Sequence, residues 1–394
     1  MSLRLSYIQK EIDIMKFNTQ LIHGGNSEDP TTGAVSTPIY RSSTFHQHVL
    51  GGEPKWEYSR TGNPTRASLE KLIAELEHGT AGFAFASGSA AIHATFSLFS
   101  QGDHFVVGSD VYGGTFRLIN KVLKRFGLEF TVVDMQDLKA VEDAIQDNTV
   151  AIYFETPTNP LLQIADIKEI AAIAKKHGVK TIVDNTFATP YNQQPLTLGA
   201  DIVVHSATKY LGGHSDVVAG LAVTNDNEIA EQLAFLQNSI GSTLGPDDSW
   251  LLQRGMKTLG ARMRVHQENA TAVIDFLQND EHIGKIYYPG LKNFPGHDVA
   301  AKQMRNFGAM ISFELKDGLD AKKFVESLQL IDLAESLGGI ESLIEVPAVM
   351  THGSIPRKIR LQNGIKDELI RLSVGIEDSE DIIADLQQAL EKLD

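Results

Sequence analysis

The sequence predicts an α/β fold, in which a large, mostly parallel β-sheet with helices on both faces is followed by a smaller C-terminal α+β domain. Three aliphatic runs carry this prediction, at residues 150–155 (VAIYFE), 181–184 (TIVD) and 201–206 (DIVVHS). A segment with helical spacing at 167–177 separates the first two. Continuous apolar runs separated by helices are typical of parallel strands that are buried on both faces.

Shorter elements precede these runs and continue the alternation of helix and strand. Apolar residues at helical spacing predict helices at 69–76, 90–99 and 116–126. Short apolar runs predict buried strands at 81–86 and 104–107. Because crossovers between parallel strands are right-handed, we expect the helices to cover both faces of the sheet.

The pattern changes after Lys257, and this change divides the chain. A long helix is predicted at 261–278, strands at 285–288, 309–315 and 370–374, and helices at 321–328 and 378–392. We therefore expect a large domain over 64–257 and a second domain over 258–394. Residues 1–63 are rich in turn signals and are expected to form an arm that contacts a neighbouring subunit. The first fifteen residues lack a signal-peptide pattern, and we set them apart from the fold.

Composition excludes several classes of function. With 50 acidic and 35 basic residues the formal net charge is −15, which argues against nucleic acid or an anionic membrane as a partner. No apolar run reaches the roughly 18 residues of a transmembrane helix. The chain has no cysteine, so disulfides, thiolate nucleophiles and cysteine-ligated metals are excluded. This composition fits a reducing compartment, and we expect a cytoplasmic protein with no metal site.

Residues able to do chemistry gather where the predicted strands end, which is where open parallel sheets bind ligands. Glu155 and Asp184 end two aliphatic runs, and Lys209 follows the third in the segment SATKY. The turn at 87–89 (SGS) offers backbone N–H groups to an anion. Each feature alone also has a plain structural interpretation, as a helix cap, a loop carboxylate, a solvated lysine or a tight turn. Their convergence on one sheet edge is what indicates a site.

This set of residues matches the requirements of pyridoxal phosphate (PLP). The aldehyde of PLP needs an amine, which Lys209 supplies. Its ring nitrogen keeps a proton beside a buried carboxylate, for which Asp184 is the candidate. The phosphate needs hydroxyls, backbone N–H groups and an arginine, and the ring face needs an aromatic side chain.

Nine segments, in this order, resemble those of the Cys/Met-metabolism PLP enzymes, the trans-sulfuration group. They are EYSRTGNPTR, FASGSAA, DVYGGTFR, ETPTNP, VDNTFATP, HSATKYLGGHSDVVAG, AESLGGIESL, PAVMTHGS and RLSVGIED. The resemblance runs from about Phe17 to the C-terminus. It implies PLP fold type I, the aspartate-aminotransferase type, and a homotetramer built of two active-site dimers.

The resemblance also implies roles for individual residues. Lys209 is expected to form the Schiff base, Asp184 to hold the pyridine nitrogen, and Tyr112 to stack on the ring and act as a base. The implied phosphate ligands are Gly88, Ser89, Ser206 and Thr208, together with Tyr58 and Arg60 from a neighbouring subunit. Near the substrate carboxylate the resemblance implies Asn159, Ser336 and Arg371, and it places Glu335, next to Ser336 in sequence, among the substrate-binding residues.

A planar guanidinium suits a carboxylate clamp, because it can donate two parallel hydrogen bonds. From the residues alone, however, Arg371 is better explained as a domain-interface ion pair. Glu335 likewise has a plain alternative, as a solvated loop carboxylate. The roles of both residues therefore depend on the resemblance.

Within the group, the residues favour cystathionine γ-lyase, which cleaves L-cystathionine to cysteine, 2-oxobutanoate and ammonia. Methionine γ-lyases usually have a cysteine where this chain has Gly114. Glu335 resembles γ-lyases and γ-synthases, and an acid there suits a substrate with a second ammonium group. The segment EVPAVMTH favours the lyase over the synthase. Cystathionine γ-synthase, cystathionine β-lyase and methionine γ-lyase stay open, as do side activities in β-elimination and H₂S release.

Two other classes of protein share part of this pattern. A Rossmann dehydrogenase has a similar sheet pattern, but no GxGxxG follows the first predicted strand. A non-catalytic binding protein with the same fold would not need Lys209, Asp184 and Tyr112 together. The sequence therefore favours an enzyme that acts on a small amino acid.

Overall fold

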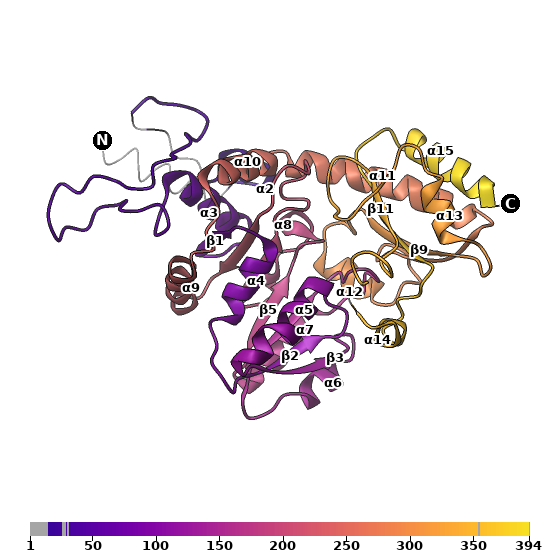
Figure 1. Cartoon of the computed structure of the whole chain (residues 1–394), viewed down its shortest axis with the longest axis horizontal. Coiled ribbons are helices and arrows are strands. Elements are labelled where there is room, and N and C mark those ends of the chain that lie inside the picture. The colour runs from indigo at the N-terminus through magenta and orange to yellow at the C-terminus, as the bar shows by residue number, and fades with distance from the viewer. Residues whose placement is uncertain (1–14, 26–28, 30, 354, 394) are drawn as a thin grey trace.

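The computed structural model describes residues 15–25, 29, 31–353 and 355–393 (Figure 1). Residues 1–14, most of the segment that we set apart from the fold, lie outside the described residues. Figure 1 shows two sheet-containing bodies connected by the long helix α11 (Leu259–Asn279). The irregular segment before α3 (Pro64–Leu76) extends away from the first body.

Within the described ranges the first sheet has seven strands, in the order β1-β7-β6-β5-β4-β2-β3. The strands from β6 to β3 run parallel, whereas β7 is antiparallel to both β6 and β1. The mostly parallel sheet is thus confirmed. Its strands are β1 (Ala81–Phe85), β2 (His104–Gly108), β3 (Glu129–Val133), β4 (Thr149–Glu155), β5 (Lys180–Asp184), β6 (Ile202–Ser206) and β7 (Gly220–Thr224).

Side chains along the central strands point alternately to two covered faces. In β4, Ala151 and Tyr153 join the core beneath α4, α5 and α9, whereas Ile152 and Phe154 join the core beneath α6 and α7. Because both faces are covered, the strand is apolar without interruption. The helices are α4 (Gly88–Phe96), α5 (Gly113–Lys121), α6 (Leu138–Asp143), α7 (Ile167–His177) and α9 (Asn227–Ile240).

Capping residues set the bounds of these helices. The Asp166 side chain accepts a hydrogen bond from the Glu169 N–H (3.1 Å) at the start of α7, and Gly178 ends it at φ +70°. The single helix predicted at 116–126 is wrong, because α5 ends at Lys121 and a 3₁₀ turn follows at Leu123–Phe126. Gly127, at φ +81°, closes that turn.

The second sheet has five strands in the described residues, in the order β10-β11-β12-β9-β8. Helix α11 contributes side chains to both hydrophobic cores. Leu259 and Met263 pack in the first core, and Val273 and Leu277 pack in the second. It begins just after residue 258, where we predicted the second domain to start. The strands are β8 (Ile283–Tyr287), β9 (Met310–Leu315), β10 (Asp332–Leu333), β11 (Leu343–Glu345) and β12 (Leu369–Ser373), and the other core helices are α13 (Ala321–Glu326) and α15 (Ser379–Leu390).

The arm is mostly irregular. Its one described helix is α2 (Phe17–His23), and over described residues 31–63 the only pairing is an isolated bridge between Thr44 and Tyr58. None of the described helices is long and apolar enough to cross a membrane. The remaining helical segments are α8 (Thr189–Asn192), Pro195–Leu198, α10 (Pro246–Met256), α12 (His297–Gln303), α14 (Arg357–Gln362) and Glu391–Leu393.

Candidate active site

A cavity of about 240 Å³ lies where β4, β5 and β6 end, between the first sheet and the second domain. The parallel arrangement brings these carboxyl-terminal ends to one edge. Every site residue predicted from the sequence lines this cavity, except Tyr58 and Arg60. The lining residues that were predicted are Gly88, Ser89, Tyr112, Asn159, Asp184, Ser206, Thr208, Lys209, Glu335, Ser336 and Arg371.

Tyr58 and Arg60 lie outside the cavity of their own chain. Tyr58 is exposed, and the Arg60 guanidinium carbon lies 5.6 Å from the centre of the Tyr58 ring. Arg60 Nη1 donates a hydrogen bond to the main-chain oxygen of Asn238 (2.9 Å). Both residues belong to the segment that extends from the first body (Figure 1). That they enter the cavity of a neighbouring subunit stays a prediction.

Lys209 follows β6 and is held by a residue of the second domain. Its Nζ donates a hydrogen bond to Ser336 Oγ (2.8 Å). Burial, together with the positive charge of Arg371, lowers the pKa of Lys209 to about 8. A much larger fraction of this amine is therefore neutral near pH 7 than of an exposed lysine. That is the property required of a nucleophile or a base.

Two buried carboxylates lie side by side, because Glu155 of β4 and Asp184 of β5 are paired in register. Asp184 Oδ1 accepts a hydrogen bond from the Thr186 N–H (3.0 Å), and the Thr186 and Tyr153 hydroxyls also donate to this carboxylate. Glu155 Oε1 accepts from the Tyr112 N–H (2.8 Å). Burial raises the pKa of both groups, and the nearby Asp184 charge raises that of Glu155 further. With more donors, Asp184 is the better site for the negative charge.

The cradle beside Lys209 is built from small residues. The Ser87 hydroxyl caps α4 by accepting a hydrogen bond from the Ala90 N–H (3.1 Å). The first two residues of this helix, Gly88 and Ser89, line the cavity. A Cβ at Gly88 would lie 2.8 Å from Ser206 Cβ, so only glycine fits there. Helix N-termini with exposed N–H groups bind phosphate well. Together with the amine of Lys209 and the Asp184 carboxylate, this donor set fits PLP.

Tyr112 stands at the start of α5, at the cavity wall. Its main-chain N–H is fixed by Glu155, and its side chain is 40% exposed. The phenol is therefore anchored through its backbone while its ring faces an open space. This arrangement fits an aromatic side chain that stacks on a bound ring.

Arg371, on β12, is 2% exposed, and its ion pair lies within the second domain rather than across the domain interface that the residues alone suggested. Its Nη1 forms an ion pair with Glu345 Oε1 (2.9 Å) and donates to Asn159 Oδ1 (2.9 Å). Its Nη2 donates to the main-chain oxygen of Ser336 (2.6 Å). Arg371 is thus both an ion-pair partner and a lining residue of the cavity.

Sequence reasoning missed Glu345, and did not assign a role to Thr186 or Thr351, which line the cavity. A lone acid within the apolar run LIEVPA was the available signal for Glu345. Such an acid indicates a buried partner but does not identify it. The partner, Arg371, is distant in sequence and is brought opposite Glu345 only by the pairing of β11 with β12.

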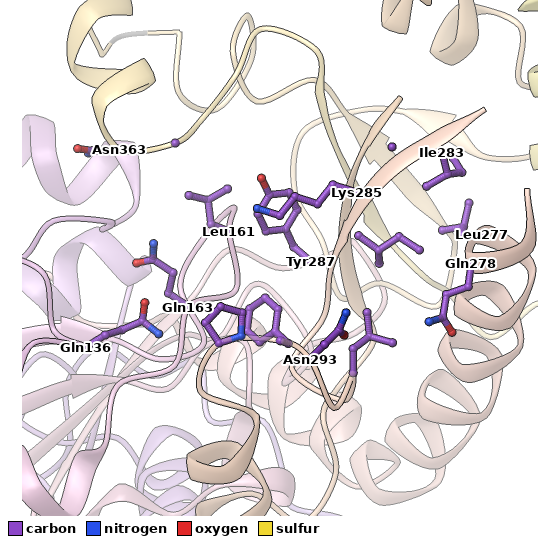
Figure 2. A pocket seen from close by; sticks show the side chains of 16 residues that line it. Gln136, Leu161, Gln163, Leu277, Gln278, Ile283, Lys285, Tyr287, Asn293 and Asn363 are labelled. Carbon is purple, nitrogen blue, oxygen red and sulfur yellow. The ribbon is translucent and has the colours of Figure 1, made fainter. Parts of the chain in front are cut away.

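Figure 2 shows a second, larger cavity of about 530 Å³, lined by residues of both domains. Lys285 and Tyr287 are the only titratable side chains among the described residues that line it. The Lys285 amine lies 4.2 Å from the centre of the Tyr287 ring. Because this cavity has no carboxylate or hydroxyl cluster, it does not offer the donor set that PLP needs.

Comparison with known proteins gives consistent matches over most of the chain. The sequence profile of the family described as Cys/Met metabolism PLP-dependent enzyme matches residues 18–391. A cystathionine beta-lyase of Lactococcus lactis is 62% identical over 95% of this chain and 98% of its own length. A cystathionine gamma-lyase of Bacillus subtilis is 58% identical over 96% of this chain and all of its own length.

A solved structure gives the same picture. The crystal structure of cystathionine gamma-lyase from Lactobacillus plantarum, complexed with L-serine, superimposes with a TM-score of 0.95. It is 63% identical in sequence, and the match covers 96% of this chain and 99% of that one. The overall arrangement of both sheets is therefore shared with a solved relative.

Proposed function

Because the chain belongs to the Cys/Met metabolism PLP-dependent enzymes, we propose that it cleaves L-cystathionine by γ-elimination to cysteine, 2-oxobutanoate and ammonia. Family membership confirms the expected fold type I, the PLP cofactor and carbon–sulfur lyase chemistry. What we propose beyond family membership is the substrate, L-cystathionine, and cleavage of its Cγ–S bond. The observation that carries it is the cavity itself, in which a half-buried lysine, a buried carboxylate and a buried arginine converge.

The cavity residues have different roles toward the cofactor. When bound, PLP supplies a ring that accepts the negative charge developing at the substrate Cα. Asp184 holds the proton of the ring nitrogen, and Gly88, Ser89, Ser206 and Thr208 hold the phosphate. Lys209 would hold the aldehyde of the cofactor, and its amine would carry protons between Cα and the sulfur-bearing side of the substrate.

The substrate is held at its carboxylate end. Arg371 and Asn159 bind the α-carboxylate and turn Cα toward Lys209. Tyr112 acts as the base that takes a proton from the incoming ammonium group. Glu335 is exposed at the cavity, where its carboxylate can attract the distal ammonium group of cystathionine.

A second candidate reaction is β-elimination, which yields homocysteine, pyruvate and ammonia. The high identity with a relative named cystathionine beta-lyase favours it. Both reactions begin with removal of the Cα proton, so the same residues serve either one. The two reactions then differ: β-elimination breaks the Cβ–S bond directly, whereas γ-elimination also requires loss of a Cβ proton before the Cγ–S bond breaks.

Product analysis with L-cystathionine tests the proposal. We expect 2-oxobutanoate and cysteine as the main products, identified by mass spectrometry. Pyruvate and homocysteine as the main products would replace γ- by β-elimination. Lys209→Ala is the control, and it should abolish both sets of products while the protein stays folded. Turnover that persists in this variant would contradict the assignment of Lys209.

Assembly and location belong to the same proposal. We infer a cytoplasmic homotetramer built of two active-site dimers, in which Tyr58 and Arg60 complete the phosphate site of a neighbouring subunit. The support is that these two residues lie outside the cavity of their own chain, although they belong to a motif of the family.

A further inference from the structure

Glu345 forms a buried ion pair with Arg371, and the proposed mechanism gives Glu345 no role. The two residues are opposite each other on the antiparallel strands β11 and β12, and their side chains are 0% and 2% exposed. Glu345 Oε1 lies 2.9 Å from Arg371 Nη1 and also accepts a hydrogen bond from the Thr351 hydroxyl (2.6 Å). The position of Arg371 is therefore set by groups of the second domain before any substrate binds.

The hydrogen bonds of the guanidinium show which donors stay available. An arginine has five N–H donors. Nη1 donates to Asn159 and forms the ion pair with Glu345, and Nη2 donates once, to Ser336. Among the residues that the structure describes, Nε is buried without a hydrogen-bond partner. One N–H on Nη2 and the one on Nε are thus left, on neighbouring nitrogens, which is the number that a carboxylate accepts in a bidentate pair.

The charge of Glu345 matters as well as its position. Without Glu345, Arg371 and Lys209 would place two positive charges beside one cavity. Burial and Arg371 already lower the pKa of Lys209, whereas Glu345 acts in the opposite direction. An uncompensated cationic cavity would attract any small carboxylate anion. With Glu345 in place, Arg371 offers a carboxylate two directed hydrogen bonds, while the Glu345–Arg371 pair has little net charge.

We propose that Glu345 is a specificity-determining positioning residue, which holds Arg371 and neutralises it so that a carboxylate is retained only in a ligand that also carries an amino group. This inference rests on the proposed function of the cavity as an amino-acid site. It identifies the residue through which zwitterionic amino acids are preferred over simple carboxylate anions. Glu345 acts through Arg371 and is not itself a catalytic residue.

The test is binding of propionate, a carboxylate without an amino group, to the PLP-loaded enzyme. Titration is followed by the visible absorbance of the cofactor, so no turnover is needed. In Glu345→Gln we expect propionate to bind at least about 10-fold more tightly than in the wild type, because one buried counter-charge is removed. Unchanged propionate affinity in the folded variant would overturn the proposal.

Glu335→Gln is the matched control, since it removes the same charge from an exposed acid of the same cavity. Its effect on propionate should stay below about threefold, because solvent screens it. An equally large effect in this control would show that net charge alone matters, and would also contradict the proposal.

Glu345→Asp is a second test variant, because Glu345→Gln leaves a buried guanidinium without its counter-ion and can lose the fold. Aspartate keeps the charge but is one methylene shorter, so we expect an intermediate gain in propionate affinity of about threefold. Unchanged affinity in this variant, with Glu345→Gln unfolded by circular dichroism, would equally reject the proposal. Failure of the wild type to cleave cystathionine would reject only the proposed substrate, since the propionate titration does not depend on it.

Discussion

The Lys209 amine and the Ser336 hydroxyl are joined by a 2.8 Å hydrogen bond, although the two residues are 127 positions apart in the chain. Ser336 also accepts a hydrogen bond from Arg371 Nη2 through its main-chain oxygen (2.6 Å). Its backbone is at φ +94°, a region that residues with a side chain rarely adopt. One strained serine therefore connects the lysine of the first domain with the arginine of the second.

Replacing Ser336 separates the hydroxyl from the backbone strain. Ser336→Gly should raise the free energy of unfolding by about 1 kcal/mol, because glycine adopts positive φ freely. Ser336→Ala should give no such gain. Both variants lack the hydroxyl, so both should lose about 10- to 100-fold in kcat/KM. Urea unfolding and steady-state kinetics check this. Full activity in either variant would show that the bond to Lys209 is dispensable.

Capture of PLP by the cofactor-free protein should depend on the titration of Lys209. Only the neutral amine attacks an aldehyde, and burial lowers the pKa of Lys209 from 10.5 to about 8. The rate should therefore rise with pH, reach half its plateau near pH 8, and level off above. Stopped-flow absorbance measures this rate. Because Arg371 contributes to the lowered pKa, Arg371→Gln should move the midpoint to higher pH. A wild-type rate that still climbs at pH 10 would contradict the assignment.

The two adjacent carboxylates should respond differently to amide substitution. Burial and the neighbouring Asp184 charge raise the pKa of Glu155 well above its ordinary value, which favours its protonated form. Glu155→Gln resembles that protonated form and should keep activity within about threefold. Asp184→Asn removes the charge that we propose holds the ring-nitrogen proton, and should lose at least about 100-fold in kcat/KM. Kinetics at saturating PLP test the pair, and equal losses in both would show that Glu155 is ionised.

Mixing two inactive variants tests whether Arg60 serves a neighbouring subunit. In an Arg60→Ala and Lys209→Ala hybrid dimer, one site would contain both wild-type residues and the other neither. Random pairing makes half of the dimers hybrids, so activity should recover to about a quarter of the wild-type value. The parent proteins, dissociated and reassembled alone, are the controls. No gain over the parents would place Arg60 in the site of its own chain or outside any site.

Glu335 should influence the choice of substrate. Its exposed carboxylate is available to the distal ammonium group of cystathionine, which homocysteine lacks. Glu335→Ala should lower kcat/KM for cystathionine by about three- to thirtyfold, a modest loss because solvent screens the pair. Activity with homocysteine should hold or rise. The two substrates are compared in the same variant, and equal losses would mean that Glu335 positions the loop around Ser336.

Much of the fold could be read from local patterns. The buried strands β4, β5 and β6 are apolar on both faces, so each produces an uninterrupted aliphatic run. Strands β3 and β7 were not predicted. The first is a partly exposed edge strand with Glu129 and Thr131 in it, and the second is a short run that begins with glycine. Neither has the periodicity that marks a strand by itself.

The sequence by itself determined the parallel sheet, its residues at the strand ends and, through its motifs, the PLP family. These features depend on short segments, whose side chains and spacing carry the signal locally. The tertiary structure alone decided three contacts. Glu345 faces Arg371, Ser336 accepts a hydrogen bond from Lys209 while its own backbone is at positive φ, and Glu155 accepts a hydrogen bond from the Tyr112 N–H. Each of these contacts joins segments that are distant in sequence. Their partners depend on strand pairing and domain packing, which no local pattern encodes.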